Sequence, residues 1–197
     1  MNILPINKNG YSKDYWGPRL WYLIHKITYN YPSKVTPNTK LFYLKYFNLI
    51  VRIIACPYCS LHLQNEIQHN NLSNNLENRQ LLIYWFKNLH NEINTSNGKR
   101  VYNGFELDMI YEQNQFNHAY FNELVIYQYY LASNNVIKKS AYIYWILTTY
   151  KIHPCNICKG ESKYYLVIND ISKLEWQNDH VLKNWLIGLI NVNKNHF

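Results

Sequence analysis

Apolar side chains recur at helical spacing through most of the first hundred residues. They predict four helices, which are separated by prolines and by an asparagine-rich stretch at residues 70–78 that we interpret as a loop. The predicted helices cover residues 16–28, 40–55, 57–69 and 79–94. In the fourth helix a second, polar face runs beside the apolar one, formed by Lys87, His90, Asn91 and Asn94. A polar stripe of this kind must meet water or a polar ligand.

The second half of the chain has the same helical character. One constant shift along the sequence places Cys155 and Cys158 on Cys56 and Cys59, and brings Trp185 close to Trp85. Such self-similarity is typical of a duplicated unit. The pattern predicts an all-α protein of two helical bundles, residues 1–112 and residues 113–197. The second bundle is either a degenerate copy of the first or an unrelated helical unit.

The charge and the apolar runs exclude two classes of function. The net charge is +8, but the 20 Lys and Arg residues are scattered and form only two adjacent pairs, so we expect no nucleic-acid partner. The apolar runs are far shorter than the roughly 20 residues that cross a bilayer. The start of the chain lacks a signal-peptide pattern. We therefore expect a cytoplasmic protein without a membrane span.

The candidate chemistry lies in four cysteines, which form two C-x-x-C pairs. Cys56 and Cys59 follow a long apolar helix, and Pro57 suits the first position of the next one. The positive end of a helix dipole stabilises a thiolate there, which favours thiol–disulfide exchange. The alternative is a structural zinc-binding or interaction protein, in which both pairs hold one Zn²⁺.

The residues around the first pair form a longer pattern. Trp and His residues precede the pair and a His-Asn motif with a later Gly-Lys follows it: Trp16-Gly17-Pro18, Trp21, His25, Tyr31-Pro32, Cys56, Cys59, His90-Asn91 and Gly98-Lys99. In this order the pattern resembles the Erv/ALR family of FAD-dependent sulfhydryl oxidases, over about half of the chain. Large DNA viruses encode compact members of this kind, so the resemblance is compatible with a viral protein in the host cytoplasm or the virion.

The resemblance implies a four- or five-helix bundle that binds FAD. It implies that a substrate thiolate attacks Cys56, and that Cys59 lies beside the flavin and passes two electrons to it. Oxygen would then reoxidise the flavin and yield hydrogen peroxide. The implied partners are protein thiols, including those of a thioredoxin-like relay protein, and a second copy of the chain or an internal pseudo-dimer.

The FAD-binding residues implied by the family match two groups of positions. They are Gly17, Trp21 and His25 in the first motif, and His90, Asn91, Asn94 and Lys99 in the second. Lys87 is a further candidate because its charge can meet a pyrophosphate. No metal is implied. The family's cysteine and Trp-rich segment after this point are missing, and aromatic residues stand there instead: Phe105, Tyr111 and Phe116.

The second pair, Cys155 and Cys158, allows three interpretations. It is a shuttle disulfide that relays electrons to Cys56, a structural relic of a degenerate second module, or half of a zinc site. The constant shift places Tyr120 and Leu124 at the positions of Trp21 and His25, and Ile190, one residue beyond the shifted position, takes the place of His90. We therefore expect no second FAD site.

Overall fold

A computed structural model of the chain describes residues 12–112 and 115–192, in which every regular element is a helix. The predicted all-α class is confirmed. In chain order the helices are α1 (Lys13–Tyr29), α2 (Pro37–Ile53), α3 (Pro57–His69), α4 (Leu72–Asn75), α5 (Arg79–Ser96), α6 (Gly104–Tyr111), α7 (His118–Ser133), α8 (Lys139–Lys151), α9 (Asn156–Ile168) and α10 (Asp179–Asn191), with a 3-10 turn at Ile171–Lys173.

The four predicted helices of the first half correspond to α1, α2, α3 and α5. The interpretation of residues 70–78 as a loop was wrong in part, because this stretch contains the short helix α4. Leu72 and Leu76 at its two ends are fully buried. Their burial holds one helical turn within a sequence that is otherwise polar, which local propensity alone does not predict.

The abundant asparagines define many of the helix boundaries. Four helices have an asparagine N-cap whose side-chain oxygen accepts a hydrogen bond from a free backbone N–H: Asn78 for α5, Asn103 for α6, Asn117 for α7 and Asn178 for α10. At α6 the bond is reciprocated, since the Glu106 side chain accepts from the backbone N–H of Asn103. Each such cap contributes about 1 kcal/mol to helix stability.

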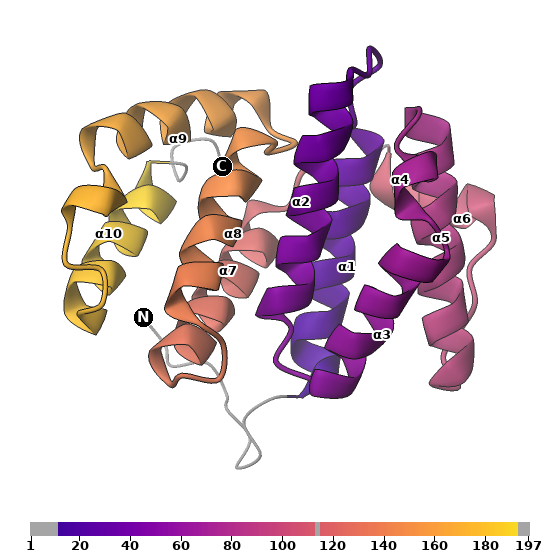
Figure 1. Ribbon diagram of the computed structural model, residues 1–197, viewed down its shortest axis with the longest axis horizontal. Coiled ribbons are helices and arrows are strands. Elements are labelled where there is room, and N and C mark those ends of the chain that lie inside the picture. The colour runs from indigo at the N-terminus through magenta and orange to yellow at the C-terminus, as the bar shows by residue number, and fades with distance from the viewer. Residues whose placement is uncertain (1–11, 113–114, 193–197) are drawn as a thin grey trace.

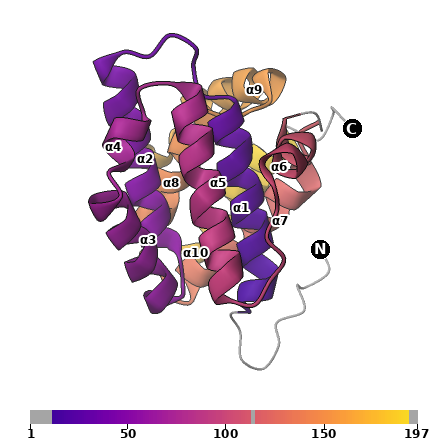
Figure 2. The ribbon, with the colours of Figure 1, turned by 90° about the vertical axis from the view of Figure 1, so that its right-hand side faces the viewer.

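The two halves of the chain share one hydrophobic core. Helix α1 packs against α7, and α2 packs against α8 (Figures 1 and 2). These two contacts form the interface between the first and the second half of the chain. Within the interface Thr149 donates a hydrogen bond to the hydroxyl of Tyr46 (3.2 Å). Arg19 forms an ion pair with Glu123 (2.5 Å). The division into domains at residue 112 therefore stays a prediction.

Equivalent positions of the two halves have equivalent contacts. Trp85 of α5 donates to the carbonyl of Asn70 (3.1 Å), and Trp185 of α10 donates to the carbonyl of Asn169 (2.8 Å). Both tryptophans are buried. The constant shift fails at α7, however, because the starts of α1 and α7 lie further apart in sequence than the starts of α3 and α9. A duplicated bundle accounts for the paired tryptophans, and it remains a prediction.

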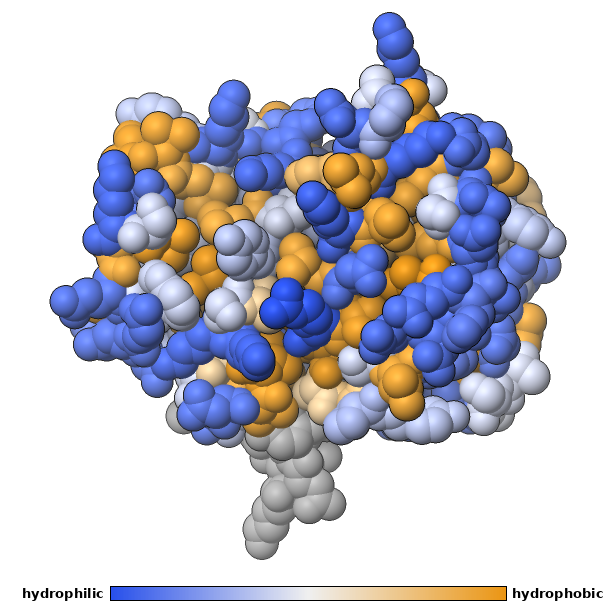
Figure 3. All heavy atoms as spheres, in the orientation of Figure 1, coloured by the Kyte–Doolittle hydropathy of each residue, from blue (hydrophilic) through white to orange (hydrophobic). Residues whose placement is uncertain are grey.

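Hydrophilic side chains cover most of the molecular face in Figure 3, with hydrophobic side chains between them. One hydrophobic area lies over α9, which exposes Ile157, Tyr164, Val167 and Ile168. Among the described residues no helix combines the length and the apolar character needed to cross a bilayer.

Candidate functional site

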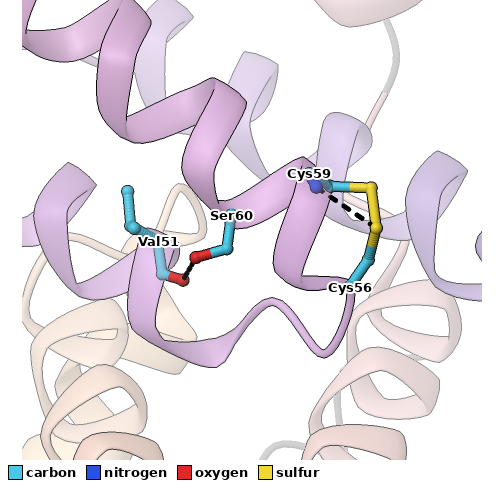
Figure 4. Close-up of a disulfide and its surroundings, with 4 residues drawn as sticks. All are labelled: Val51, Cys56, Cys59 and Ser60. Carbon is cyan, nitrogen blue, oxygen red and sulfur yellow. Dashed lines mark hydrogen bonds between the residues drawn. A yellow bond between two sulfur atoms is a disulfide. The ribbon is translucent and has the colours of Figure 1, made fainter.

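Cys56 and Cys59 are joined by a disulfide at the first turn of α3 (Figure 4). Cys56 is the N-cap of this helix, and its sulfur accepts a hydrogen bond from the backbone N–H of Cys59 (3.2 Å). Pro57 takes the first helical position, where no N–H is needed. Ser60 donates to the carbonyl of Val51 (2.8 Å), which ties the start of α3 to the end of α2. The fold thus fixes the pair at a helix N-terminus, as predicted.

The surroundings of the disulfide are open to solvent. Both cysteines are half-buried, so their exposure does not distinguish the sulfur that a substrate would attack. Tyr58, between them, is 78% exposed, and Leu61 is 57% exposed. An apolar surface therefore borders a reachable disulfide. Since the helix dipole and the N–H of Cys59 both stabilise negative charge here, reduction would release a thiolate in a favourable place.

Trp21, His25 and His90 come together between α1 and α5. The His25 Nε2 and His90 Nδ1 atoms are 2.8 Å apart and share a hydrogen bond. The Trp21 ring stacks on the His90 ring with centroids 4.2 Å apart and planes 8° apart. Tyr111 at the end of α6 stacks on His25 from another direction, at 4.3 Å. The structure thus brings three predicted residues into one ring cluster, although His90 lies 65 positions after His25 in the sequence.

Burial keeps the two histidines of this cluster neutral. Burial lowers the pKa of His90 to about 4, and burial followed by the neighbouring His90 and Lys87 lowers the pKa of His25 well below its usual value. The Nδ1 atom of His25 is buried and has no hydrogen-bond partner in the described structure. An unpaired buried nitrogen costs about 1–3 kcal/mol, so a polar ligand that reached it would be stabilised.

Acid should destabilise the protein through these histidines. Their folded-state pKa values lie below the unfolded value of about 6.5, so the unfolded state binds more protons as the pH falls from about 6.5 to 4. The contribution of the neutral histidines to the free energy of unfolding is complete above pH 6.5, and the loss from His90 alone should reach about 2 kcal/mol near pH 5. Urea unfolding at pH 7.5 and pH 5 measures this loss. His90→Gln should have a smaller loss than the exposed control His180→Gln; equal losses would contradict the assignment to His90.

The polar face of α5 is occupied largely by the segment that follows this helix. The Asn91 side chain donates to the carbonyl of Tyr102 (2.6 Å) and accepts from the N–H of Tyr102 (3.0 Å). The Asn94 side chain donates to the carbonyl of Arg100 (3.0 Å). These two predicted cofactor ligands therefore shape the loop between α5 and α6, and only His90 of the polar stripe reaches the ring cluster.

The two predicted cationic ligands are paired with carboxylates. Lys87 contacts Asp108 of α6 (2.5 Å), beside a cavity of about 310 Å³ between α5, α6 and the end of α1. Lys99 pairs with Asp14 at the surface (2.8 Å). A cofactor phosphate would have to compete with these carboxylates. Gly17 is half-buried, and a Cβ atom added there would meet no atom of another segment within 4 Å. The packing of this chain therefore does not require a glycine at this position.

Among the aromatic residues that replace the family's Trp-rich segment, only Tyr111 reaches the ring cluster. Phe105 is 72% exposed. Phe116 packs against His118 and His153 in the second half. Tyr111 lies on α6, which the hydrophobic pattern did not predict, and the capping signal at Asn103 with Glu106 could have indicated this helix.

Cys155 and Cys158 repeat the arrangement of the first pair but are not joined by a disulfide. Cys155 is the N-cap of α9 and its sulfur accepts from the N–H of Cys158 (3.2 Å). Burial, followed by the neighbouring Cys155, raises the pKa of Cys158 to about 12. In the described residues no cluster of candidate metal ligands combines the two pairs, so the structure does not support one zinc ion held by both.

These observations define a class: an all-α protein with a reachable disulfide at a helix N-terminus and a separate cluster of stacked rings on neighbouring helices of the same bundle. Residues 18–115 match the model of the Erv1/Alr family. Over this region the chain belongs to the Erv1/Alr family.

Two viral proteins are among its relatives. One, from Acanthamoeba polyphaga mimivirus, is named a probable FAD-linked sulfhydryl oxidase; it is 28% identical over 91 residues, which are 46% of this chain and 64% of that protein. Another, from African swine fever virus, is named an FAD-linked sulfhydryl oxidase; it is 28% identical over 105 residues, which are 52% of this chain and 85% of that protein. The similarity therefore spans less than two thirds of the mimivirus protein. No solved structure matches the chain significantly.

Proposed function

We propose that the first half of the chain is an FAD-dependent thiol oxidase, which forms disulfides in protein substrates and reduces oxygen to hydrogen peroxide. The observation that carries the proposal is the disulfide of Cys56 and Cys59, held at the N-terminus of α3 with a solvent-accessible apolar border. The family membership and the names of the viral relatives support the same activity.

The chain's own residues account for the exchange steps. A substrate thiolate attacks the sulfur of Cys56, the bond between Cys56 and Cys59 breaks, and Cys59 leaves as a thiolate. A second substrate thiol then attacks the mixed disulfide, which releases the substrate disulfide and leaves Cys56 reduced. Two electrons and two protons have moved from the substrate to the pair. Exposed Tyr58 offers a contact for an unfolded or flexible polypeptide beside Cys56.

We infer that the ring cluster and its neighbours hold the flavin nucleotide. When bound, FAD accepts the two electrons from the reduced pair and passes them to oxygen. Trp21 and His90 offer planar faces, the unpaired Nδ1 of His25 offers a hydrogen-bonding atom, and the open space beside Gly17 allows close approach. Asn91 and Asn94 would act through the loop that they hold, and Lys87 or Lys99 would exchange a carboxylate partner for a phosphate.

We infer that Cys59 is the cysteine next to the flavin, that the second half takes the place of a second copy of the chain in a pseudo-dimer, and that the protein acts in the cytoplasm or the virion. The packing of α1 on α7 and of α2 on α8 supports the pseudo-dimer, since helices that the duplication would make equivalent contact each other between the two halves.

A visible absorption spectrum of the purified chain tests the function. We expect a flavin spectrum that bleaches on anaerobic addition of dithiothreitol and returns with air, with one hydrogen peroxide released per dithiol oxidised. A chain that binds added FAD but is not reduced by dithiols would contradict the oxidase assignment. A chain that neither retains nor binds FAD would contradict the cofactor site as well.

A further inference from the structure

Among the residues that the structure describes, the second C-x-x-C pair shares a cluster of candidate metal ligands with a histidine, and the first pair does not. His118, at the first turn of α7, has its two ring nitrogens 3.6 and 3.7 Å from the sulfur of Cys158. A ring nitrogen of His118 and the sulfurs of Cys155 and Cys158 all lie within 4.8 Å of one another. The constant shift aligned the cysteines of the two halves but gave no sign of this histidine, which comes from a helix 40 positions away.

A backbone hydrogen bond positions Cys155, and two aromatic contacts position the His118 ring. Cys155 is the N-cap of α9, and its backbone N–H donates to Nδ1 of His153 (3.1 Å). His153 is buried and stacks on the His118 ring, with centroids 5.9 Å apart. Phe116 packs edge-on against His118 at 4.9 Å. The donor atoms of α7 and α9 thus meet in a site whose walls are aromatic rings.

The spacing fits a tetrahedral ion with sulfur and nitrogen ligands. Zn–S bonds of about 2.3 Å and Zn–N bonds of about 2.0–2.1 Å place the two ligand atoms about 3.6 Å apart at the tetrahedral angle. The distance from the Cys158 sulfur to the nearer His118 nitrogen has that value, and since the other ring nitrogen is almost equally far (3.7 Å), a turn of the ring directs one nitrogen lone pair at the ion. Two thiolates with one imidazole suit Zn²⁺ and exclude Mg²⁺ and Ca²⁺, which prefer oxygen ligands.

We propose that His118, Cys155 and Cys158 bind one Zn²⁺ ion, which joins the start of α7 to the start of α9. The half-buried Cys155 leaves one side of the ion accessible, so a water molecule completes the coordination. Binding releases to solvent the protons of the two thiols. His153 is a positioning residue that orients Cys155 through the backbone.

The second pair differs from the first in its oxidation state and in the accessibility of its thiols. Cys56 and Cys59 are oxidised to a disulfide and do not share a cluster of candidate ligands in the described part of the chain. Buried Cys158 is poorly reachable for exchange with a substrate thiol, which is the chemistry that a shuttle would need. The zinc site therefore goes beyond the proposed oxidase function and does not depend on it.

Zinc analysis of the full chain tests the site. The protein, purified under anaerobic reducing conditions and loaded with Zn²⁺, is dialysed, and the metal is measured by mass spectrometry. We expect one Zn²⁺ per chain in the wild type, and a Zn²⁺ affinity at least about tenfold weaker in His118→Gln and Cys155→Ser. Serine keeps the N-cap of α9, so the second variant should fold. A chelator should lower the melting temperature of the wild type by on the order of 5 °C and leave that of His118→Gln unchanged.

Two control variants separate this site from the oxidase site. Cys56→Ser, at the equivalent cap in the first half, and His180→Gln, on the exposed start of α10, should retain the zinc of the wild type. Zinc retained equally by His118→Gln, or lost equally from Cys56→Ser, would overturn the site. The site would also be overturned if the wild type bound no zinc and if Cys155 and Cys158 resisted alkylation because they form a disulfide. Flavin content is read from the same samples, so a failed oxidase proposal would be visible separately.

Discussion

Replacing Cys59 by serine should leave the purified protein yellow but lower thiol oxidation by on the order of a thousandfold or more. A hydroxyl cannot form the disulfide that a substrate thiolate attacks, so electrons have no route from the substrate into the bundle. The fold should persist, because the disulfide spans residues only three apart and constrains the unfolded chain little. Oxygen consumption with dithiothreitol, alongside the flavin spectrum, measures both expectations.

The matched control for this variant is the neighbouring residue. Ser60→Ala removes the hydrogen bond to the carbonyl of Val51 and leaves both thiols in place (Figure 4). It should cost about 1 kcal/mol of stability and retain the turnover of the wild type. If Cys59→Ser still oxidised dithiols at the rate of the control, the first pair would not be the redox centre.

Replacing Trp21 by alanine should remove most of the bound flavin. Trp21 is half-buried and stacks on His90 with planes 8° apart, so alanine removes a planar apolar face from the ring cluster. Loss of that stacking and of the associated apolar contact should weaken FAD binding about tenfold to a hundredfold. The ratio of flavin absorbance to protein absorbance after gel filtration, and the dissociation constant for added FAD, measure the change.

Two further tryptophan variants separate binding from folding. Trp21→Phe retains a flat ring and should keep more flavin than Trp21→Ala. Trp185→Phe removes an indole from the second half, together with its hydrogen bond to Asn169, and should lower stability without releasing flavin. Full flavin content in a folded Trp21→Ala protein would place the cofactor elsewhere.

Much of the helical architecture follows from local sequence. The starts of α2 and α3 are fixed by prolines, and the start of α5 by the Asn78 cap, all signals that act within one turn. The position of the disulfide follows from the same local rules. Helices α4 and α6 escaped prediction, since α4 depends on the burial of Leu72 and Leu76 in the core that α4 shares with α2, α3 and α5, and α6 is a short element with a weak apolar pattern.

The candidate site was predictable as a set of residues but not as a geometry. The motif order indicated Trp21, His25 and His90, and these three side chains do meet. The other predicted ligands have other partners: Asn91 and Asn94 of the motif contact the loop after α5, Lys99 of the motif contacts Asp14, and Lys87, proposed for its charge, contacts α6. Side chains on one helix face reach different partners according to how the following segment folds back. Sequence spacing does not contain that information.

The sequence by itself determined the helical class, the placement of Cys56 and Cys59 at a helix N-terminus and the family over residues 18–115, because these depend on local periodicity, capping and motif order. Only the tertiary structure decided what surrounds each pair. It packed α1 on α7 and α2 on α8 into one core, and it brought His118 to Cys158. Contacts between distant segments are set by the packing of whole helices, and two nearly identical local motifs therefore acquire different neighbours and different chemistry.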